Sequence, residues 1–166
     1  HQLAARPTMT ALSLIEHHAV EAAAPREVLT CRLGTEEYGL DILSVQEIRR
    51  YEPPTRIANA AIHMLGVMNL RGVIVPILDL RYLLGLPAEV DTNTVTVVVT
   101  VGGRTVGLVV DAVSDVLALA PEQVQPRPAL GRQTQADFIV GLAQVTSGEQ
   151  QRLLLLVDLP TLLLDL

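Results

Sequence analysis

The chain reads GVMNLRGVIVPILDL from Gly66 to Leu80, two apolar runs on either side of a polar corner. Apolar runs of this length that flank a glycine-containing turn are typical of a β-hairpin. The second run, residues 72–78, is almost continuously apolar, which predicts a strand covered on both faces. The corner Asn69-Leu70-Arg71-Gly72 carries a single guanidinium, which the hairpin would lift off an otherwise aliphatic sheet.

Short helices are expected where the buried strands end. Asp79 follows the second run and predicts the N-cap of a helix over 80–84, because its carboxylate can accept a hydrogen bond from the first helical turn. Gly85 favours the end of that helix. A final buried strand over 153–157 leads in the same way into a last helix that is capped by Asp158.

Earlier residues alternate between apolar and polar, the period expected of half-buried strands. Leu29, Cys31 and Leu33 form one such strand, and the return strand through 38–42 follows a turn at 34–37. This pattern places Cys31 among apolar side chains, where we expect a buried and unreactive thiol.

A later hairpin follows the same plan. Valines occupy alternate positions from 95 to 101, and Gly102-Gly103 forms a two-residue turn into a strand over 105–111. The order hairpin, glycine-led strand, buried strand and capped helix therefore occurs twice along the chain. This order predicts a duplicated β module, whose copies of about 70 residues are individually marginal and gain a larger core by packing together.

Composition limits the class of protein. A chain of 166 residues suits one domain or two small subdomains that share a core. The residues are 49% hydrophobic with only three Tyr and one Phe, so the core should be aliphatic. So many apolar residues fit either a well-filled core or exposed interaction patches. The net charge of −6 and the few aromatic residues argue against binding to nucleic acid or anionic lipid. The single cysteine fits a reducing compartment.

The ends of the chain and its membrane relationship are also predicted. Residues 1–26 are expected to form a flexible tail, in which 1–8 would be a non-native extension and Met9 a candidate natural start. We expect no signal peptide and no membrane-spanning segment, because no apolar run approaches the roughly 18–20 residues that a bilayer requires.

The sequence offers little for catalysis. None of the four histidines has metal-ligand neighbours at a recognised spacing, and no serine lies in a nucleophile-elbow context. The glycine pair 102–103 lies between two strands, so it does not open a phosphate-binding helix. We therefore predict a protein that is not an enzyme and that holds no metal or cofactor.

Two segments together resemble the CheW family of chemotaxis adaptors. They are GTEEYGLDILSVQEI, residues 34–48, and the hairpin over 66–80, and the resemblance extends from about 28 to 165. It implies a mainly β fold of two SH3-like five-stranded barrels that share a core within residues 27–166, with short helices. It also implies a cytoplasmic adaptor, associated with membrane receptor arrays, that couples transmembrane chemoreceptors to the histidine kinase CheA. No contact with nucleic acid and no insertion into the membrane are expected.

The resemblance implies that the tip of the receptor's cytoplasmic helical hairpin binds at Ile42, Val45, Glu47, Gly66 and Arg71. Taken without it, Arg71 fits an exposed turn arginine slightly better than a binding residue, although its planar fork suits a partner's carboxylate. Ile42 and Val45 would by themselves fit ordinary core better than an apolar patch. A helix laid into a groove edged by Glu47 and Arg71 is the mode of binding expected.

A second surface is implied for the regulatory domain of the kinase. By resemblance it includes Thr94, Val95 and Gly107, and the contact would pair related barrels. The missing side chain of Gly107 would allow another chain to approach closely, whereas a glycine packed within the barrel fits the sequence equally well.

Other functions stay open at this point. The closest alternative is an adaptor of a related chemosensory pathway, such as type IV pilus motility or surface sensing. A regulatory domain from a longer kinase is another. A barrel that binds a small ligand or nucleic acid is opposed by the acidity and the few aromatic residues.

Overall fold

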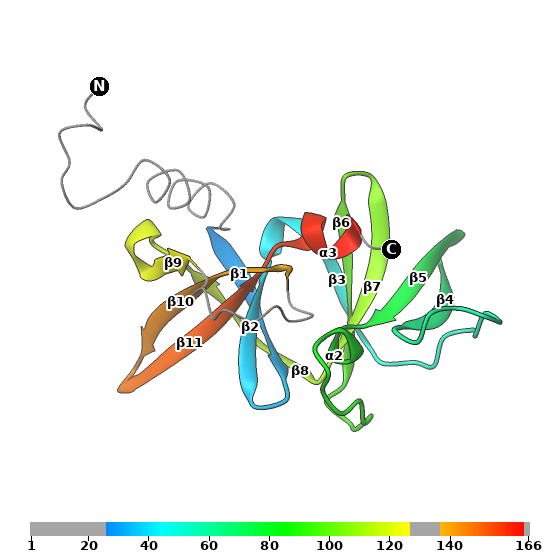
Figure 1. The fold of residues 1–166 in the computed structure, drawn as a ribbon, viewed down its shortest axis with the longest axis horizontal. Helices are drawn as coiled ribbons and strands as arrows, with labels where there is room; N and C mark the ends of the chain where they lie inside the picture. The colour runs from blue at the N-terminus through cyan, green and yellow to red at the C-terminus, as the bar shows by residue number, and fades with distance from the viewer. Residues whose placement is uncertain (1–25, 127–136, 165–166) are drawn as a thin grey trace.

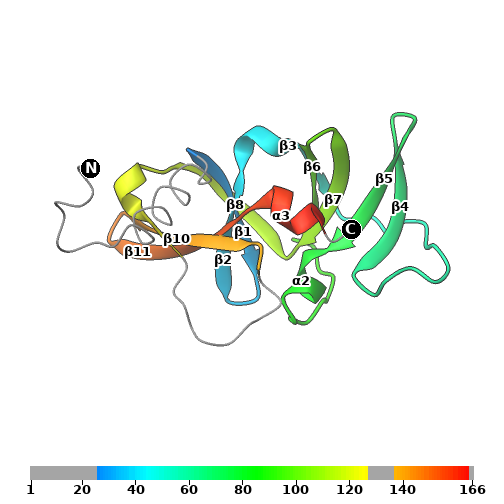
Figure 2. The same ribbon diagram turned by 45° about the horizontal axis from the view of Figure 1, so that its top comes forward.

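The computed structural model describes residues 26–126 and 137–164, which form two β-sheets lying side by side (Figures 1 and 2). The predicted tail over 1–26 falls outside the described residues except for Arg26. The six-stranded sheet has the order β8 (Ala112–Ala118), β1 (Glu27–Leu33), β2 (Glu36–Asp41), β11 (Gln150–Val157), β10 (Ile139–Ser147) and β9 (Val124–Pro126). The five-stranded sheet has the order β3 (Val45–Arg50), β6 (Val95–Val101), β7 (Arg104–Val110), β5 (Val73–Asp79) and β4 (Met64–Leu70).

The helices are short, as predicted. They are α2 (Leu80–Leu83), α3 (Leu159–Leu164) and the 3₁₀ turns η2 (Ile42–Ser44) and η3 (Pro121–Gln123). The mainly β fold class is therefore confirmed, but one sheet has six strands instead of five, because the short β9 adds to the edge formed by β10.

The two halves of the chain exchange hairpins. The early hairpin β1–β2 joins the late strands, where β2 pairs in parallel with β11 and Gly39 lies opposite Leu156. The later hairpin β6–β7 joins the early strands, where β7 pairs in parallel with β5 and Gly107 lies opposite Ile77. Each sheet therefore combines a hairpin from one half with strands from the other, so neither half can form its sheet alone.

Apolar residues pack into three clusters. One lies within the five-stranded barrel and includes Leu70, Val75, Ile77, Val98 and Val109. A second lies within the six-stranded barrel and includes Val28, Leu119, Val124, Ala143, Val145, Leu154 and Leu156. The largest lies between the sheets and is completed by α3; it contains Leu29, Cys31, Leu33, Tyr38, Leu40, Leu78, Leu80, Val97, Val99, Val106, Leu108, Val110, Phe138, Ile139, Val157, Leu159, Leu162 and Leu163.

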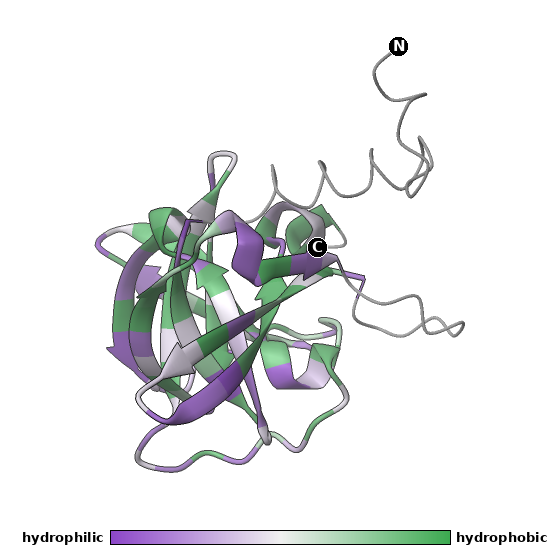
Figure 3. Cartoon of the chain, turned by 90° about the vertical axis from the view of Figure 1, so that its left-hand side faces the viewer, coloured by the Kyte–Doolittle hydropathy of each residue, from purple (hydrophilic) through white to green (hydrophobic). Residues whose placement is uncertain are grey.

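The shared cluster explains the alternating pattern of the strands, which is visible as alternating hydropathy in Figure 3. On β1, Val28 points into its own barrel while Leu29 and Cys31 point into the cluster between the sheets. The expectation of a buried thiol is confirmed, and burial raises the pKa of the Cys31 thiol to about 12, which disfavours the reactive thiolate.

The predicted caps are present. The Asp79 carboxylate accepts a hydrogen bond from the backbone N–H of Arg81 at 3.0 Å, and Asp158 accepts one from Thr161 at 3.3 Å. The predicted turn at Gly102-Gly103 joins β6 to β7, and both glycines have positive φ, as a tight two-residue turn requires.

The prediction that residues 72–78 are covered on both faces is wrong for its first half. Val73 and Ile74 are more than half exposed, whereas Val75, Ile77 and Leu78 are buried. The parallel pairing with β7 begins only at Ile77, so the start of β5 extends beyond that neighbour. Leu153 in β11 is exposed for the same reason, because the pairing of β11 with β2 begins at the next residue.

Thr96 offers a test of this packing. Its side chain is buried within the five-stranded barrel, and its hydroxyl has no hydrogen-bond partner among the residues that the structure describes. Replacing Thr96 with Val should raise the free energy of unfolding by about 1 to 3 kcal/mol, because the change removes an unsatisfied buried hydroxyl and keeps the side-chain shape. Urea denaturation measures the change. Thr100→Val is the control, because the Thr100 hydroxyl is bonded to that of Thr105, and it should give no gain. A lower stability for Thr96→Val would contradict this packing.

Candidate functional site

An exposed ion pair joins the two edges of the five-stranded sheet. Arg71 lies in the turn between β4 and β5, and its Nη2 donates to Glu47 Oε2 on β3 at 2.6 Å. β3 and β4 are the outermost strands of this sheet, so the pair spans the open side of the barrel. The Arg71 side chain is 67% exposed, which leaves most of its fork accessible to another molecule.

The turn that carries Arg71 has an unusual backbone. Arg71 has φ 53° and Gly72 has φ 87°, the geometry of a two-residue hairpin turn in which Asn or Gly is the favoured first residue. The Asn69 side chain accepts a hydrogen bond from the Gly72 N–H at 2.8 Å and stabilises the turn. An arginine at positive φ is disfavoured, and such residues cluster at functional positions. The turn alone therefore does not account for the guanidinium.

Glu47 is held between two arginines. Its carboxylate accepts a hydrogen bond from Arg71 and another from Arg49 at 3.2 Å. These bonds hold the pKa of Glu47 below its ordinary value, and the bond from Arg71 has the largest effect. The Arg71 pKa is raised by the same contact, so both groups are charged at neutral pH.

The other barrel contains a similar cluster around a less exposed arginine. Arg152 on β11 donates to Glu37 at 3.1 Å and to Asp115 on β8 at 3.0 Å, and Thr30 also donates to Asp115. The Arg152 side chain is only 13% exposed, whereas that of Asp115 is 43% exposed. Arg71 and Glu47 form the same kind of contact with a more exposed arginine, and an ion pair of this kind adds little to stability.

The predicted apolar patch is only partly at the surface. Ile42 and Val45 are half-buried and pack against the cluster shared by the two sheets. Between them Leu43 is 90% exposed, and the sequence reasoning missed it. The turn η2, which Asp41 caps by accepting from the Leu43 N–H, breaks the strand alternation and turns Leu43 outward.

Gly66 contributes backbone geometry to this region and no side chain. It is buried at a β-bulge of β4 with φ 153°, and a Cβ added there would lie 2.1 Å from the Thr55 carbonyl oxygen. Thr55 and Val67 exchange two backbone hydrogen bonds of 2.8 Å beside it. A glycine is therefore needed at this position for residue 55 to pack against β4.

The residues predicted for the kinase surface have different environments. Thr94 is 1% exposed, and its hydroxyl accepts a hydrogen bond from the Asp91 N–H at 2.9 Å. Val95 is half-buried, and with Thr94 it lines a shallow hollow together with residues 48–50 of β3 and 112–113 of β8.

Of the two alternatives for Gly107, close approach by another chain does not fit the structure. Gly107 pairs with Val98 within the sheet, and β5 and β6 flank it on either side. A Cβ added there would lie 2.7 Å from Ile77 Cδ1 and 2.8 Å from Thr96 Cγ2. The missing side chain therefore makes room for neighbours in the same barrel, which is the packing alternative that the sequence left open.

The described residues show neither a metal site nor a membrane helix. No three side chains from His, Cys, Asp or Glu gather there in a way that would hold a metal ion. Within the same residues, every helix is too short to cross a bilayer.

Two β-barrels that share a core define a double-barrel protein of the SH3-like class. Residues 27–166 match the model of the CheW-like domain, and the chain belongs to that family.

Known proteins of similar sequence match this chain over most of its length. A chemotaxis protein CheW of Klebsiella aerogenes is 47% identical over 156 residues, which are 93% of this chain and 91% of that protein. A probable chemotaxis protein CheW of Rhizobium etli is 38% identical over 138 residues, 82% of this chain and 86% of that protein. The crystal structure of the scaffolding protein TtCheW from Thermoanaerobacter tengcongensis has a TM-score of 0.71 and 28% identity, and the match covers 81% of this chain and 85% of that one.

The Glu47 carboxylate provides a direct test of the ion pair. In an NMR titration its pKa should lie below 4.5, its ordinary value, and Arg71→Asn should move the pKa back toward that value. Because the folded-state pKa is lowered, the stability that Glu47 contributes is present above its unfolded pKa and is lost as the pH falls through the folded pKa. Asn suits the positive φ of position 71, so the turn should survive. An unchanged pKa in the variant would show that the two side chains do not interact.

Proposed function

We propose that this protein is a non-catalytic chemotaxis adaptor that couples the cytoplasmic tips of transmembrane receptors to the histidine kinase CheA. Membership of the CheW-like family and the names of the relatives support the adaptor role. The main observation in support of receptor binding is Arg71, an exposed arginine at a backbone position that favours Asn or Gly. The protein would work in the cytoplasm, associated with receptor arrays.

The receptor surface would be formed by Ile42, Val45, Glu47, Gly66 and Arg71. Arg71 supplies the exposed guanidinium, which can bind a carboxylate or backbone carbonyls of a receptor helix. Glu47 orients that guanidinium through the 2.6 Å contact. Ile42 and Val45 supply the half-buried apolar floor, and Gly66 holds the β4 backbone close to Thr55.

The kinase surface would lie around Thr94, Val95 and Gly107. Val95 is the member of this set whose side chain is partly accessible, so it would make the direct contact. The buried Thr94 and Gly107 would act through the strands, by fixing the start of β6 and the spacing between β5, β6 and β7.

The proposed coupling of receptor to kinase depends on having both surfaces on one rigid body. When the adaptor is bound to a receptor, its contact with the kinase becomes effectively intramolecular, so two weak contacts give a stable assembly. The receptor can change kinase activity only if one receptor state binds the adaptor and kinase better than the other.

The receptor side predicts the behaviour of Arg71→Asp. This variant should abolish receptor-coupled kinase activation, because it replaces the binding charge and repels Glu47, while its far-UV circular dichroism stays that of the wild type. The assay is kinase autophosphorylation with reconstituted receptor fragments. Arg32→Asp makes the same charge change at an exposed position on β1 and should retain activation. Normal activation by Arg71→Asp would remove Arg71 from the receptor surface.

The kinase side predicts the behaviour of Val95→Glu. A charge at this half-buried position should weaken binding to the kinase regulatory domain and spare binding to receptor fragments, as measured by calorimetry. Val116→Glu, at an exposed valine of β8, is the matched control and should spare both. If Val95→Glu lowers both affinities together with the melting temperature, Val95 belongs to the core and not to a docking surface.

A further inference from the structure

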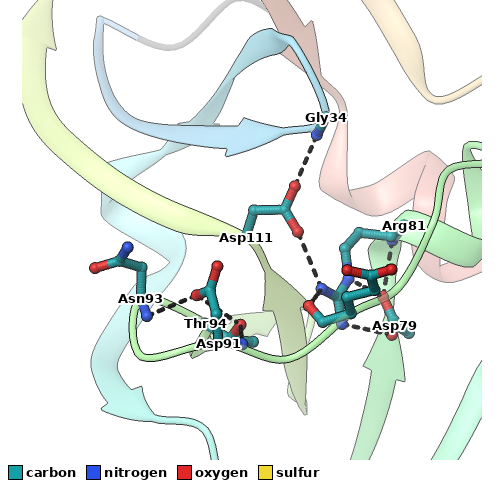
Figure 4. A network of polar contacts seen from close by, with 8 residues as sticks. Gly34, Asp79, Arg81, Asp91, Asn93, Thr94 and Asp111 are labelled. Carbon is teal, nitrogen blue, oxygen red and sulfur yellow. Dashed lines mark hydrogen bonds and ion pairs between the residues drawn. The ribbon is translucent and has the colours of Figure 1, made fainter.

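A buried arginine lies where the two barrels meet (Figure 4). The Arg81 side chain is 1% exposed, and its guanidinium makes four hydrogen bonds. Nε and Nη2 donate to the two carboxylate oxygens of Asp79 at 2.9 and 3.0 Å, and Nη1 donates to Asp111 Oδ1 at 3.0 Å and to the Glu89 carbonyl oxygen at 2.7 Å.

These contacts connect both sheets. Asp79 ends β5 of the five-stranded sheet, and Asp111 lies at the junction between β7 and β8, where the chain passes from one sheet to the other. The second carboxylate oxygen of Asp111 accepts from the backbone N–H of Gly34 at 2.8 Å, in the turn between β1 and β2. Arg81 therefore fixes the start of α2 relative to a hairpin of the opposite barrel.

The Glu89 contact holds a segment that has little apolar anchorage. Residues 89–93 are all exposed, so burial of side chains does not set their position. The segment is held by polar contacts: that of Arg81 with the Glu89 carbonyl, and those of Asp91 with the Asn93 N–H at 2.7 Å and with Thr94. It leads directly into Thr94 and Val95 at the start of β6.

We propose that Arg81 is a positioning residue for the kinase surface: by holding the Glu89 carbonyl, Asp79 and Asp111 at once, it fixes the 89–94 segment and thereby the place of Val95. This inference rests on the proposed function of the Val95 surface. Arginine is required because its planar fork reaches three acceptors in different directions, whereas the single ammonium of lysine does not.

Arg81→Lys tests the proposal, because it keeps the charge and removes the fork. Arg152→Lys is the matched control, since Arg152 is also largely buried between two carboxylates but contacts only the six-stranded sheet. Amide hydrogen exchange of residues 89–94 is measured together with affinity for the kinase regulatory domain and for a receptor fragment. Asp111→Asn is a second variant that loosens the same contacts and keeps Arg81, in case Arg81→Lys does not fold.

The expected result is about a tenfold faster exchange in 89–94 and about a tenfold weaker binding to the kinase, with receptor affinity unchanged. Arg152→Lys should produce neither effect selectively. Unchanged exchange in both Arg81→Lys and Asp111→Asn overturns the proposal, and so does faster exchange with unchanged kinase affinity. If the unmodified protein does not bind the kinase domain, the proposed function fails. If it binds and the variants bind equally well, only the role of Arg81 as a positioning residue fails.

Discussion

The two parallel strand pairings, β2 with β11 and β5 with β7, are the constraint on which the rest of the structure depends. Each joins a hairpin from one half of the chain to strands from the other half. Because of this exchange, β1 and β7 are covered on both faces, and the cluster between the sheets becomes the largest apolar cluster among the described residues. Each fully buried Leu or Val in that cluster contributes about 1.5–3 kcal/mol, so the two barrels are held as one body.

A rigid pair of barrels is what an adaptor needs. If one partner binds at the 47–71 edge and another near residue 95, their relative positions are set by the shared core and by the Arg81 contacts. The two barrels also use related chemistry for different ends. In the six-stranded barrel the Arg152 side chain, between Glu37 and Asp115, is 13% exposed, and in the five-stranded barrel the Arg71 side chain beside Glu47 is 67% exposed. Of these two arginines, Arg71 is therefore the more accessible to another molecule.

Local chemistry was predictable from the sequence. The caps at Asp79 and Asp158 and the turn at Gly102-Gly103 depend on neighbouring residues, so the sequence predicts them correctly. The double-barrel fold and the family were also predictable, because their motifs are long and cover nearly the whole chain.

Contacts between distant residues were not predictable in the same way. Gly107 packs against Ile77 and Gly66 against Thr55, and no local pattern reveals which distant group fills the space above a glycine. The exposure of Val73 depends on where the pairing between β5 and β7 begins. The exposure of Leu43 was missed because a three-residue 3₁₀ turn interrupts the strand period. The role of Arg81 was missed because one of its carboxylate partners, Asp111, is 30 residues away in the sequence.

The central claim is that one rigid chain holds a receptor and a kinase at the same time. Co-sedimentation of receptor fragments in membranes with purified kinase, in the presence and absence of this protein, tests it most directly. The account predicts that the kinase pellets with the receptor only when the protein is added, and that all three then pellet together. If receptor and kinase instead displace each other from the protein, the two surfaces overlap and the adaptor account is contradicted.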